Sequence, residues 1–432
     1  MPQALMHPPP VSEIARHFAG ALAKSQNLSQ PEIARRQTML LEKLCRHARS
    51  HVPFYRDSKR LDPLFTKGGN FDLSGWQDVP VLTRAEAREN EDALKAEIIP
   101  PEMLPVSGDR TSGSTGTPLF IRRSFIQMIS SRALFDRAVQ WNKCGPIHRL
   151  AITDVVERVD EHESVAPSDP RSPIVIPAHL PPLAQMQIVA REKPSHAIVF
   201  PNLVESWIET GQLDHLASLR VVFSTGEILR PHVRVALERK LNVRVIDLYS
   251  ATETGPIAIA GPDGRLRVSE ETLLLEQPSG PIDPSRPVQV IATPFYAYAM
   301  PLLRYATGDY VRFSARRPRE SIALRRLEGV LGRERSLFRR RDGTRIWPAV
   351  HGDIIGDIIE LRGWQLVQET LDDIVLKIIT PMDATAEQLS RCGSALAKMV
   401  PGFNVRVEVV DRIADERATG KRFESCLSLI AS

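Results

Sequence analysis

The chain has 432 residues, of which 42% are hydrophobic and 25% charged, and a formal net charge of +4. This composition excludes a disordered chain and allows two or three domains with substantial cores. No stretch has the length of a membrane span, and the N-terminus lacks the pattern of a signal peptide, so we expect a cytoplasmic protein without a membrane partner. Four scattered cysteines without a CxxC pair predict reduced thiols and no disulfide frame or zinc site: Cys45, Cys144, Cys392 and Cys426.

The first predicted element is a helix near the N-terminus. Ser12 is a suitable cap, and Ile14, Phe18 and Leu22 fall near one face of the turns that follow. A helix with one apolar face is expected to pack on the main body of the protein rather than to anchor it in a membrane.

Residues 109–124 read DRTSGSTGTPLFIRRS, a tight run of small residues that opens onto an apolar and then basic segment. Gly113 and Gly116 allow close backbone approach, and the hydroxyl residues around them can direct donors toward one oxyanion. The run predicts a phosphate-binding loop, although not a Walker A loop, because no Gly-Lys-Ser/Thr follows. An ordinary Ser/Gly turn between strands is the alternative. The hydroxyl residues are Thr111, Ser112, Ser114, Thr115 and Thr117.

Apolar strands and a helix alternate in the middle of the chain. Residues 194–201, 218–227 and 242–255 each read as a compact strand that ends in small or polar residues, and 228–241 reads as a helix. This alternation favours an α/β organisation with parallel strands. Ligands of such sheets bind beyond the carboxyl ends of the strands, which is where the motifs STGE and YSATETG fall. The sequence therefore predicts a binding site at that edge.

The segment 312–345 is rich in arginine. It lacks the interleaved aromatic residues of a stacking platform for nucleic acid. A solvated face between domains, or a site for the phosphates of a small ligand, is therefore favoured, and we expect no nucleic-acid partner.

Six motifs, in their order and spacing, resemble the signature motifs of the adenylate-forming (ANL) superfamily: TSGSTGTP at 111–118, STGE at 224–227, YSATETG at 249–255, RYATGD at 304–309, GRERS at 332–336 and ATGK at 418–421. Three further stretches are similar to the phenylacetate-CoA ligase and CapK-like branch: HARSHVPFYRD at 47–57, VPVLTRAEAREN at 79–90 and AMPLLRYATGD at 299–309. The resemblance spans nearly the whole chain, and six ordered motifs are far more specific than any one of them.

The resemblance implies an α/β fold in two parts. Residues 1–330 would form a large multi-layer N-terminal domain of mixed β-sheets and helices, the adenylation core that binds ATP and the acid. Residues 331–432 would form a small, mobile α+β C-terminal lid domain that carries the adenylation lysine. The pattern of the second part agrees, because 361–380 and 402–411 read as strands and 384–400 as a helix.

The resemblance also assigns residues to ATP and Mg²⁺. Tyr249 would lie against adenine, Asp309 would bond the ribose hydroxyls, and Glu253 would act in catalysis by helping to hold Mg²⁺. Lys421 would be the second catalytic residue and contact the substrate carboxylate and the α-phosphate during adenylation. The other nucleotide-binding residues would be Thr111, Ser112, Gly113, Ser114, Thr115, Gly116, Thr225, Gly226, Glu227, Ser250, Thr252 and Arg333.

The implied acid pocket lies between the end of the strand at 194–201, the STGE turn and the residues after YSATETG. Small residues beside apolar ones fit a flat aromatic or short branched acid, although packing within the sheet explains several of them equally well. The pocket residues would be Phe200, Pro201, Asn202, Ser224, Thr225, Ser250, Ala251, Gly255, Pro256 and Ile257, with Trp141 as a wall.

The chain departs from the family pattern at several positions. Relatives often carry a lysine near the end of the phosphate loop, where this chain has Thr117 and Leu119, so Arg122 or Arg123 is expected to substitute. Coenzyme A use rests on the resemblance alone. Two further positions differ from relatives, Ala306 and Ser336.

These inferences predict an ATP-dependent ligase that activates an aryl or small carboxylic acid as an acyl-adenylate and transfers the acyl group to a thiol. Its cofactors would be ATP, Mg²⁺ and coenzyme A. One alternative transfers the acyl group to an amine or a carrier-protein thiol in a biosynthetic pathway. Another is a non-catalytic nucleotide- or nucleic-acid-binding protein that uses the arginine-rich segment. The oligomeric state is open, a homodimer included.

Overall fold

The chain divides into two compact units, Met1–Val330 and Leu331–Ser432. Within the residues that the structure describes, no helix combines the length and the apolar character needed to cross a membrane. The structure is a computed structural model that describes residues 13–111, 119–154, 173–229, 231–315, 322–333, 336–346, 348, 355–361, 363–381, 383–411, 413 and 426–430.

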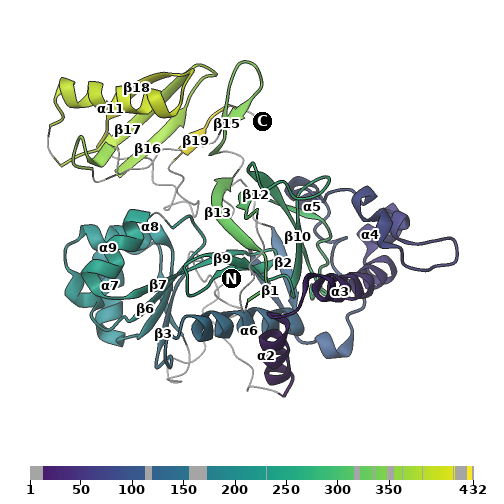
Figure 1. Cartoon of the computed structure of the whole chain (residues 1–432). Helices are drawn as coiled ribbons and strands as arrows, with labels where there is room; N and C mark the ends of the chain where they lie inside the picture. Colours follow the sequence, from purple (N-terminus) through teal and green to yellow (C-terminus); the bar gives the residue numbers. More distant parts are fainter. Residues whose placement is uncertain are drawn as a thin grey trace. The chain divides into compact units, whose positions relative to one another are not determined.

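One large sheet organises the first unit (Figure 1). The order of its described strands is β10-β11-β12-β13-β9-β8-β7-β6-β5-β3-β4. Neighbours from β4 to β7 are parallel, and β8 and β9 continue the sheet in antiparallel fashion. The strands are β3 (Leu150–Asp154), β4 (Ile174–Pro177), β5 (His196–Val199), β6 (Val221–Thr225), β7 (Arg244–Ala251), β8 (Gly255–Ala260), β9 (Leu266–Val268), β10 (Leu273–Glu276), β11 (Val288–Pro294), β12 (Tyr305–Phe313) and β13 (Arg326–Arg333).

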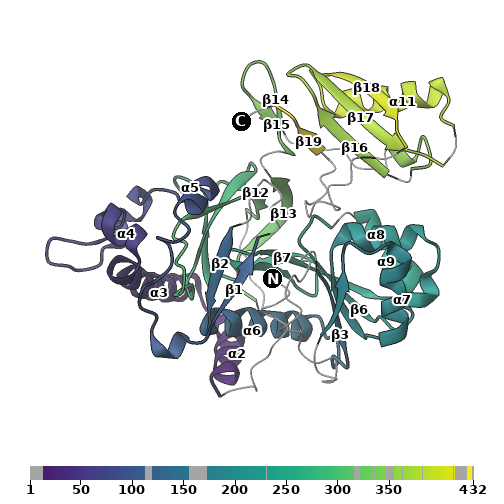
Figure 2. The ribbon, with the colours of Figure 1, turned by 180° about the vertical axis from the view of Figure 1, so that it is seen from behind.

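A separate antiparallel hairpin, β1 (Val106–Arg110) and β2 (Phe120–Ser124), leads into helix α6 (Phe125–Trp141), as seen from behind in Figure 2. Ser124 ends the hairpin and caps the helix, because its hydroxyl accepts a hydrogen bond from the backbone N–H of Gln127. The other helices of this unit are α2 (Glu13–Ser25), α3 (Gln30–His51), α4 (Pro53–Ser58), α5 (Arg84–Glu89), α7 (Pro182–Glu192), α8 (Pro201–Glu209) and α9 (Pro231–Leu241), with short 3₁₀ turns η1 (Asp62–Leu64), η2 (Leu73–Asp78), η3 (Pro101–Met103) and η4 (Leu213–Leu216).

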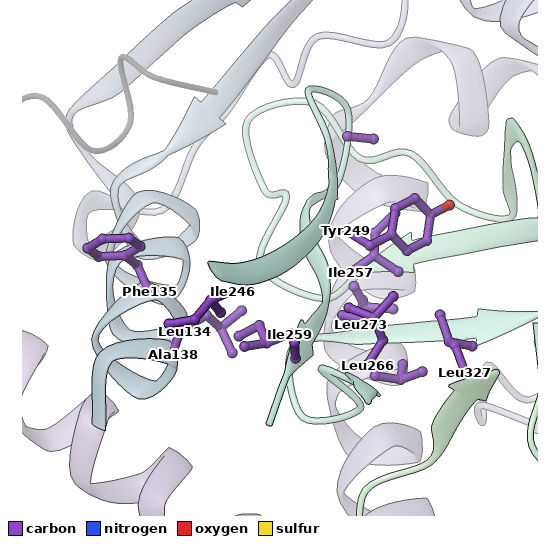
Figure 3. Close-up of a cluster of buried hydrophobic side chains, with 14 of the residues drawn as sticks. Leu134, Phe135, Ala138, Ile246, Tyr249, Ile257, Ile259, Leu266, Leu273 and Leu327 are labelled. Atoms are coloured by element: carbon purple, nitrogen blue, oxygen red, sulfur yellow. The ribbon is translucent and has the colours of Figure 1, made fainter. Parts of the chain in front are cut away.

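Helices cover both faces of the parallel strands. Successive side chains of a strand point to opposite faces, so neighbouring residues belong to different cores. Val222 belongs to a core that α7, α8 and α9 cover. Its neighbour Phe223 belongs to the core on the α6 side, where its ring centroid lies 4.8 Å from that of Phe135. Figure 3 shows Leu134 of the same helix beside the β-strand residue Ile246. Helix α6 therefore packs directly on the sheet.

A buried arginine fixes the start of β12. Arg304 forms an ion pair with Glu276 at 2.8 Å and donates to the backbone carbonyls of Trp76 and Val79 at 3.2 and 2.7 Å. These contacts satisfy a charge that is almost fully buried, which is the condition for tolerating it. They also attach η2 to the sheet and so determine where β12 begins.

The second unit is a small α+β structure with its own core. Its described sheet has the order β18-β17-β16-β19, with β16 and β17 antiparallel and the two outer pairs parallel. Leu376 of the sheet and Leu396 of helix α11 are both fully buried in that core. The two folds together confirm the predicted fold class. The elements are β14 (Phe338–Arg339), β15 (Arg345–Ile346), β16 (Gly363–Gln368), β17 (Asp373–Ile379), α11 (Ala386–Met399), β18 (Asn404–Val409) and β19 (Cys426–Ser428).

Candidate active site

The carboxyl ends of β5, β6 and β7 lie side by side. Val199 is opposite Ser224, and Thr225 is opposite Leu248. The hydroxyls of Thr225 and Ser250 lie 2.9 Å apart. The STGE and YSATETG motifs, which are separate in the sequence, therefore meet at the edge where parallel sheets bind ligands.

Gly226 in the STGE turn has a conformation and an environment that only glycine fits. Its φ is 85°, and a Cβ at this position would lie 2.7 Å from the ring of Phe200. The turn is also joined to the start of α8, because the backbone N–H of Asn202 donates to the carboxylate of Glu227 at 3.3 Å. Phe200 consequently lies against the backbone of the turn.

Tyr249 and Asp309 are neighbours in space, although 60 residues separate them in the sequence. The tyrosine hydroxyl donates to Oδ2 of Asp309 at 2.9 Å, and both side chains are buried. The backbone N–H of Asp309 donates to the hydroxyl of Thr307 at 3.1 Å. A direct hydrogen bond thus joins the two residues that the resemblance assigns to adenine and ribose.

Glu253, in the turn after β7, is paired with an arginine from α5. Its Oε1 accepts from Nη1 of Arg84 at 2.6 Å and from the hydroxyl of Tyr305 at 3.1 Å. Nη2 of Arg84 donates to the hydroxyl of Thr111 at 2.8 Å. The side chains of Arg84 and Glu253 are only 19% and 6% exposed, so their charges interact with little screening by water. Arg84 therefore links the YSATETG turn to the start of the predicted phosphate loop.

The two ends of that loop are fastened to each other. The backbone N–H of Thr111 donates to the carbonyl of Leu119, and the N–H of Leu119 donates to the hydroxyl of Thr111, both at 2.9 Å. Between them, Ser112, Gly113, Ser114, Thr115, Gly116 and Thr117 lie outside the described residues, as does Lys421. Arg333 is the last residue of β13, in the second unit.

Arg123 has a structural task, which corrects the expectation that it replaces the missing loop lysine. Its side chain is 2% exposed and pairs with Asp109 at 2.9 Å. Its other terminal nitrogen donates to the backbone carbonyl of Thr252 at 2.6 Å. Arg123 thus holds the hairpin against the YSATETG turn.

Several predicted pocket residues pack closely around the start of β8. Gly255 has a φ of 81°, and a Cβ there would lie 3.1 Å from the hydroxyl of Ser131. Ala251 and Pro256 are buried at the same turn. Ile257 has no exposed surface and belongs to the core of Figure 3, so it packs the sheet.

Trp141 is not at this edge, which corrects its assignment as a pocket wall. It ends α6, and its indole N–H donates to the side chain of Gln26 at 2.8 Å. The next residue, Asn142, donates to the carbonyl of Ala260, the last residue of β8. Because Gly255 begins β8, Trp141 lies at the opposite end of that strand.

Sequence reasoning missed Arg84 as a member of the site. The signal was present, because Arg84 belongs to VPVLTRAEAREN, a stretch already similar to the phenylacetate-CoA ligase and CapK-like branch. Nothing in the sequence indicated its partners, since Thr111 and Glu253 are 27 and 169 residues away.

The site fits Mg²⁺ that is bound together with a nucleotide. Among the residues that the structure describes, no group of three or more His, Cys, Asp or Glu side chains is arranged to hold a metal ion. Mg²⁺ in nucleotide sites is commonly bound by one or two carboxylates together with phosphate oxygens. Glu253 supplies one carboxylate next to the start of the predicted phosphate loop, so it meets this requirement.

The arginine-rich segment is partly neutralised by acidic side chains over the part that is described. Several of its arginines are engaged within their own unit, which reduces the charge available to a nucleic acid. The pairs are Arg325 with Glu270, Arg326 with Asp263 and Arg341 with Asp372.

Comparisons with known proteins agree with this geometry. A profile of the AMP-binding enzyme family matches residues 170–277, which include STGE and YSATETG. Protein CapK from Staphylococcus aureus is 26% identical over 215 residues, which cover 47% of this chain and 45% of CapK. Over these regions the chain is similar to AMP-binding enzymes and to CapK. The aligned region spans less than half the length of that curated relative.

The adenylate-forming fold extends over nearly the whole chain. A crystal structure of 2-hydroxyisobutyryl-CoA ligase in the postadenylation state, in complex with 2-HIB-AMP, matches with a TM-score of 0.72 at 18% identity and covers 93% of this chain and 90% of that one. The amide bond synthetase McbA from Marinactinospora thermotolerans gives a TM-score of 0.52 at 17% identity and covers 72% and 66%. At such identities the likeness shows a shared fold. This fold therefore occurs in both a CoA ligase and an amide bond synthetase, and does not by itself specify the acyl acceptor.

Proposed function

We propose that this protein activates a small carboxylic acid with ATP to form an acyl-adenylate and then transfers the acyl group to a thiol, with coenzyme A as the favoured acceptor. The observation that carries the proposal is the linked set of contacts at the strand ends. Arg84 joins Glu253 to Thr111, and Tyr249 joins Asp309, all beside the STGE and YSATETG turns. This is the set of groups that a nucleotide with its phosphates requires.

Tyr249 and Asp309 would position the adenosine part of ATP. A tyrosine offers an aromatic surface to a base, and a carboxylate accepts hydrogen bonds from two ribose hydroxyls. Their mutual hydrogen bond at 2.9 Å holds the two side chains in one arrangement before a nucleotide binds. Such preorganisation reduces the entropy lost on binding.

Glu253 would hold Mg²⁺, which when bound neutralises charge on the phosphates. Arg84 would place a fixed cation at the start of the phosphate loop. Relatives often carry a lysine near the other end of that loop. In the ligand-free chain the guanidinium neutralises Glu253. Arg84 has five N–H donors and makes one hydrogen bond to each of its two partners, so donors remain for phosphate oxygens.

The chemistry follows from this placement. An oxygen of the acid's carboxylate attacks the α-phosphorus, the bond to the β-phosphate oxygen breaks, and the electron pair leaves with pyrophosphate. The protein contributes by holding the two reactants in line and by stabilising charge on the departing group. In the second half, a thiolate attacks the acyl carbon and AMP leaves with the bonding pair.

The test is pyrophosphate release from MgATP with a panel of aryl, short aliphatic and amino acids, each with and without coenzyme A. We expect release that depends on one class of acid and increases with coenzyme A. Release that depends on the acid but not on coenzyme A would move the acceptor to an amine or a carrier-protein thiol. No release with any acid, together with RNA or DNA binding that weakens steeply with salt, would overturn the proposal.

A further inference from the structure

Gln127, in the first turn of α6, carries a buried amide without a hydrogen-bond partner. Its side chain is 3% exposed, and neither Nε2 nor Oε1 has a partner. Buried amide groups are nearly always paired, because an unpaired donor or acceptor keeps the cost of losing water. A glutamine in this state therefore needs an explanation beyond packing.

The structure describes every residue of α6, and the other buried polar side chains of this helix have hydrogen-bond or ion-pair partners. Ser130 and Ser131 donate to the backbone carbonyl of Gln127 at 2.8 and 3.0 Å. Arg137 pairs with Glu271 at 2.9 Å. Gln127 is thus the exception within its own helix, and the exception lies at the end nearest the candidate active site.

Three contacts locate the amide. Ser131, one turn later on the same face, approaches Gly255 at the start of β8. Leu134, a further turn along, packs in the core with the sheet (Figure 3). Arg123 of β2, just before the helix, donates to the carbonyl of Thr252. The face of α6 that carries Gln127 therefore approaches Gly255, the last residue of the YSATETG motif, and the strand that leads into α6 contacts Thr252 of the same motif.

We propose that Gln127 determines substrate specificity by binding an uncharged hydrogen-bonding group on the acid, away from the carboxylate that reacts. This inference rests on the proposed acid activation and specifies its substrate class. An amide both donates and accepts, so it matches a hydroxyl, keto or amide group. The preferred group is not a second carboxylate of the acid, because a buried charge needs a cation nearby and the neutral amide supplies none. Binding of the acid would supply the partners that the amide lacks.

The experiment compares pairs of monocarboxylic acids that differ by one hydroxyl or keto group, in aryl and short aliphatic series. The readout is the ratio of kcat/KM for ATP-dependent pyrophosphate release within each pair. The wild-type protein should prefer the polar member of one pair by about 10- to 100-fold. Gln127→Met keeps the approximate shape of the side chain and removes the amide. It should bring that ratio to about one by lowering kcat/KM for the polar acid only.

Two further variants separate specificity from folding. Ser269→Ala removes a buried hydroxyl that, like the Gln127 amide, has no partner; it lies two residues before Glu271, the partner of Arg137, and its loss should leave the ratio unchanged. Gln127→Glu keeps the size and introduces a charge, and should reduce turnover of both acids. Thermal unfolding of ligand-free Gln127→Met should occur at the wild-type temperature or above, since the unpaired amide is lost.

The outcomes distinguish this inference from the function on which it rests. Equal effects of Gln127→Met on both members of every pair, or a large fall in its unfolding temperature, would overturn the role of Gln127 and leave acid activation standing. Absence of pyrophosphate release from the wild-type protein with every acid would overturn the proposed function, and this inference with it.

Discussion

A single side chain, Arg84, connects the parts of the candidate site that act on phosphate. It bonds both Glu253 and Thr111, and it is shielded enough from water for its charge to matter. We expect Arg84→Ala to reduce acid-dependent pyrophosphate release about 100- to 1,000-fold, the usual loss when one charge-stabilising donor is removed. Arg84→Lys should recover part of the rate, because it restores the charge but not both hydrogen bonds.

The control for this prediction is Arg88→Ala. Arg88 is an exposed arginine on the same helix, α5, and should tolerate the change with wild-type kinetics. The two variants would be compared by their steady-state rates of acid-dependent pyrophosphate release at several Mg²⁺ concentrations. Equal rates for the two alanine variants would remove Arg84 from the site.

Gly226 gives a second prediction at the scale of one residue. Alanine there meets two penalties, a φ of 85° and a contact of 2.7 Å with the ring of Phe200. We expect Gly226→Ala to lower the free energy of unfolding by about 1–3 kcal/mol, measured by denaturant titration.

Gly211 separates the two penalties. It has a similar φ of 71°, but a Cβ there meets nothing within 4 Å. Gly211→Ala should therefore show the backbone cost alone. The difference between the two variants should shrink when Gly226→Ala is combined with Phe200→Ala, and a difference that persists would show that the ring does not set the cost.

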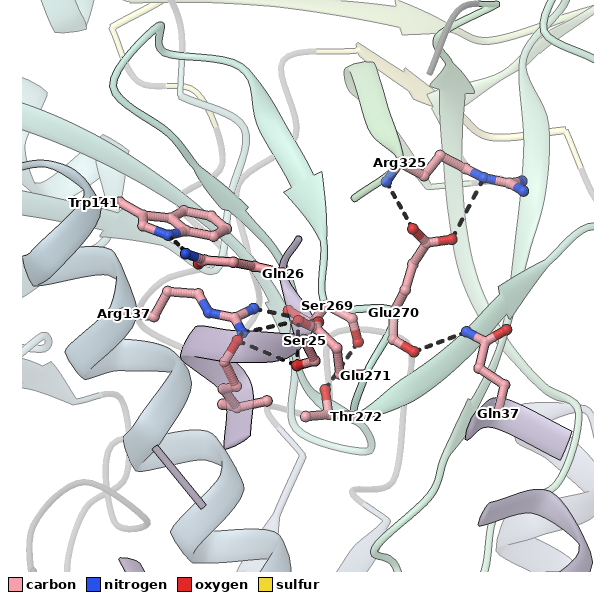
Figure 4. Close-up of polar contacts among 11 residues, drawn as sticks. Ser25, Gln26, Gln37, Arg137, Trp141, Ser269, Glu270, Glu271, Thr272 and Arg325 are labelled. Atoms are coloured by element: carbon pink, nitrogen blue, oxygen red, sulfur yellow. Dashed lines mark hydrogen bonds and ion pairs between the residues drawn. The ribbon is translucent and has the colours of Figure 1, made fainter. Parts of the chain in front are cut away.

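At the scale of elements, a buried ion pair attaches α6 to neighbouring parts of the chain (Figure 4). Arg137 pairs with Glu271 at 2.9 Å and donates to the carbonyl of Leu22 in α2 at 2.7 Å. We expect Arg137→Met to destabilise the protein by about 3–5 kcal/mol, because it leaves a buried carboxylate without its cation. Unfolding in urea would measure the loss.

The same helix supplies the matched control. Arg132 and Asp136 form an ion pair whose side chains are 36% and 39% exposed. Arg132→Met should therefore cost under about 1 kcal/mol. If both methionine variants lost the same amount, burial of the Arg137 pair would not be the source of its effect. The double variant Arg137→Met with Glu271→Leu should recover most of the loss.

The sequence predicts elements well where one pattern dominates. The three apolar runs that became β5, β6 and β7 end at one edge, where the STGE and YSATETG motifs of the last two meet, because parallel strands align their carboxyl ends. The run 361–380 is two strands, β16 and β17, and Thr370 and Asp373 hydrogen-bond in the turn between them. The apolar residues of this run predict strands, and the polar turn at Thr370 and Asp373 divides the run into two.

Long-range contacts were beyond prediction for a physical reason. The resemblance implies Trp141 as a wall of the acid pocket, yet its position depends on the direction in which α6 crosses the sheet. The same holds for the missing partner of Gln127, since hydrogen bonds across a core depend on packing that no local pattern encodes. Sequence patterns specify which edge binds a ligand, and packing specifies which side chains reach it.

At the scale of the whole molecule, each unit has a hydrophobic core of its own, so the second can be a separate functional part. Its predicted contribution to chemistry is Lys421, which lies outside the described residues. The resemblance assigns this lysine to adenylation alone. The two half-reactions should therefore respond differently to its removal.

We expect Lys421→Ala to cut acid-dependent formation of the adenylate by at least about 100-fold, since a cation that stabilises charge in the first transition state is lost. Transfer of the acyl group from a chemically prepared acyl-adenylate to coenzyme A should change far less, because the resemblance places Lys421 at the reacting groups during adenylation only. Lys398→Ala, at an exposed lysine of α11, is the control in the same unit and should leave both half-reactions intact. Adenylation that survives Lys421→Ala would mean that the ATGK motif does not carry the adenylation lysine. A parallel loss in both half-reactions would instead indicate that the residue supports the fold of the second unit, which unfolding of the variant would reveal independently.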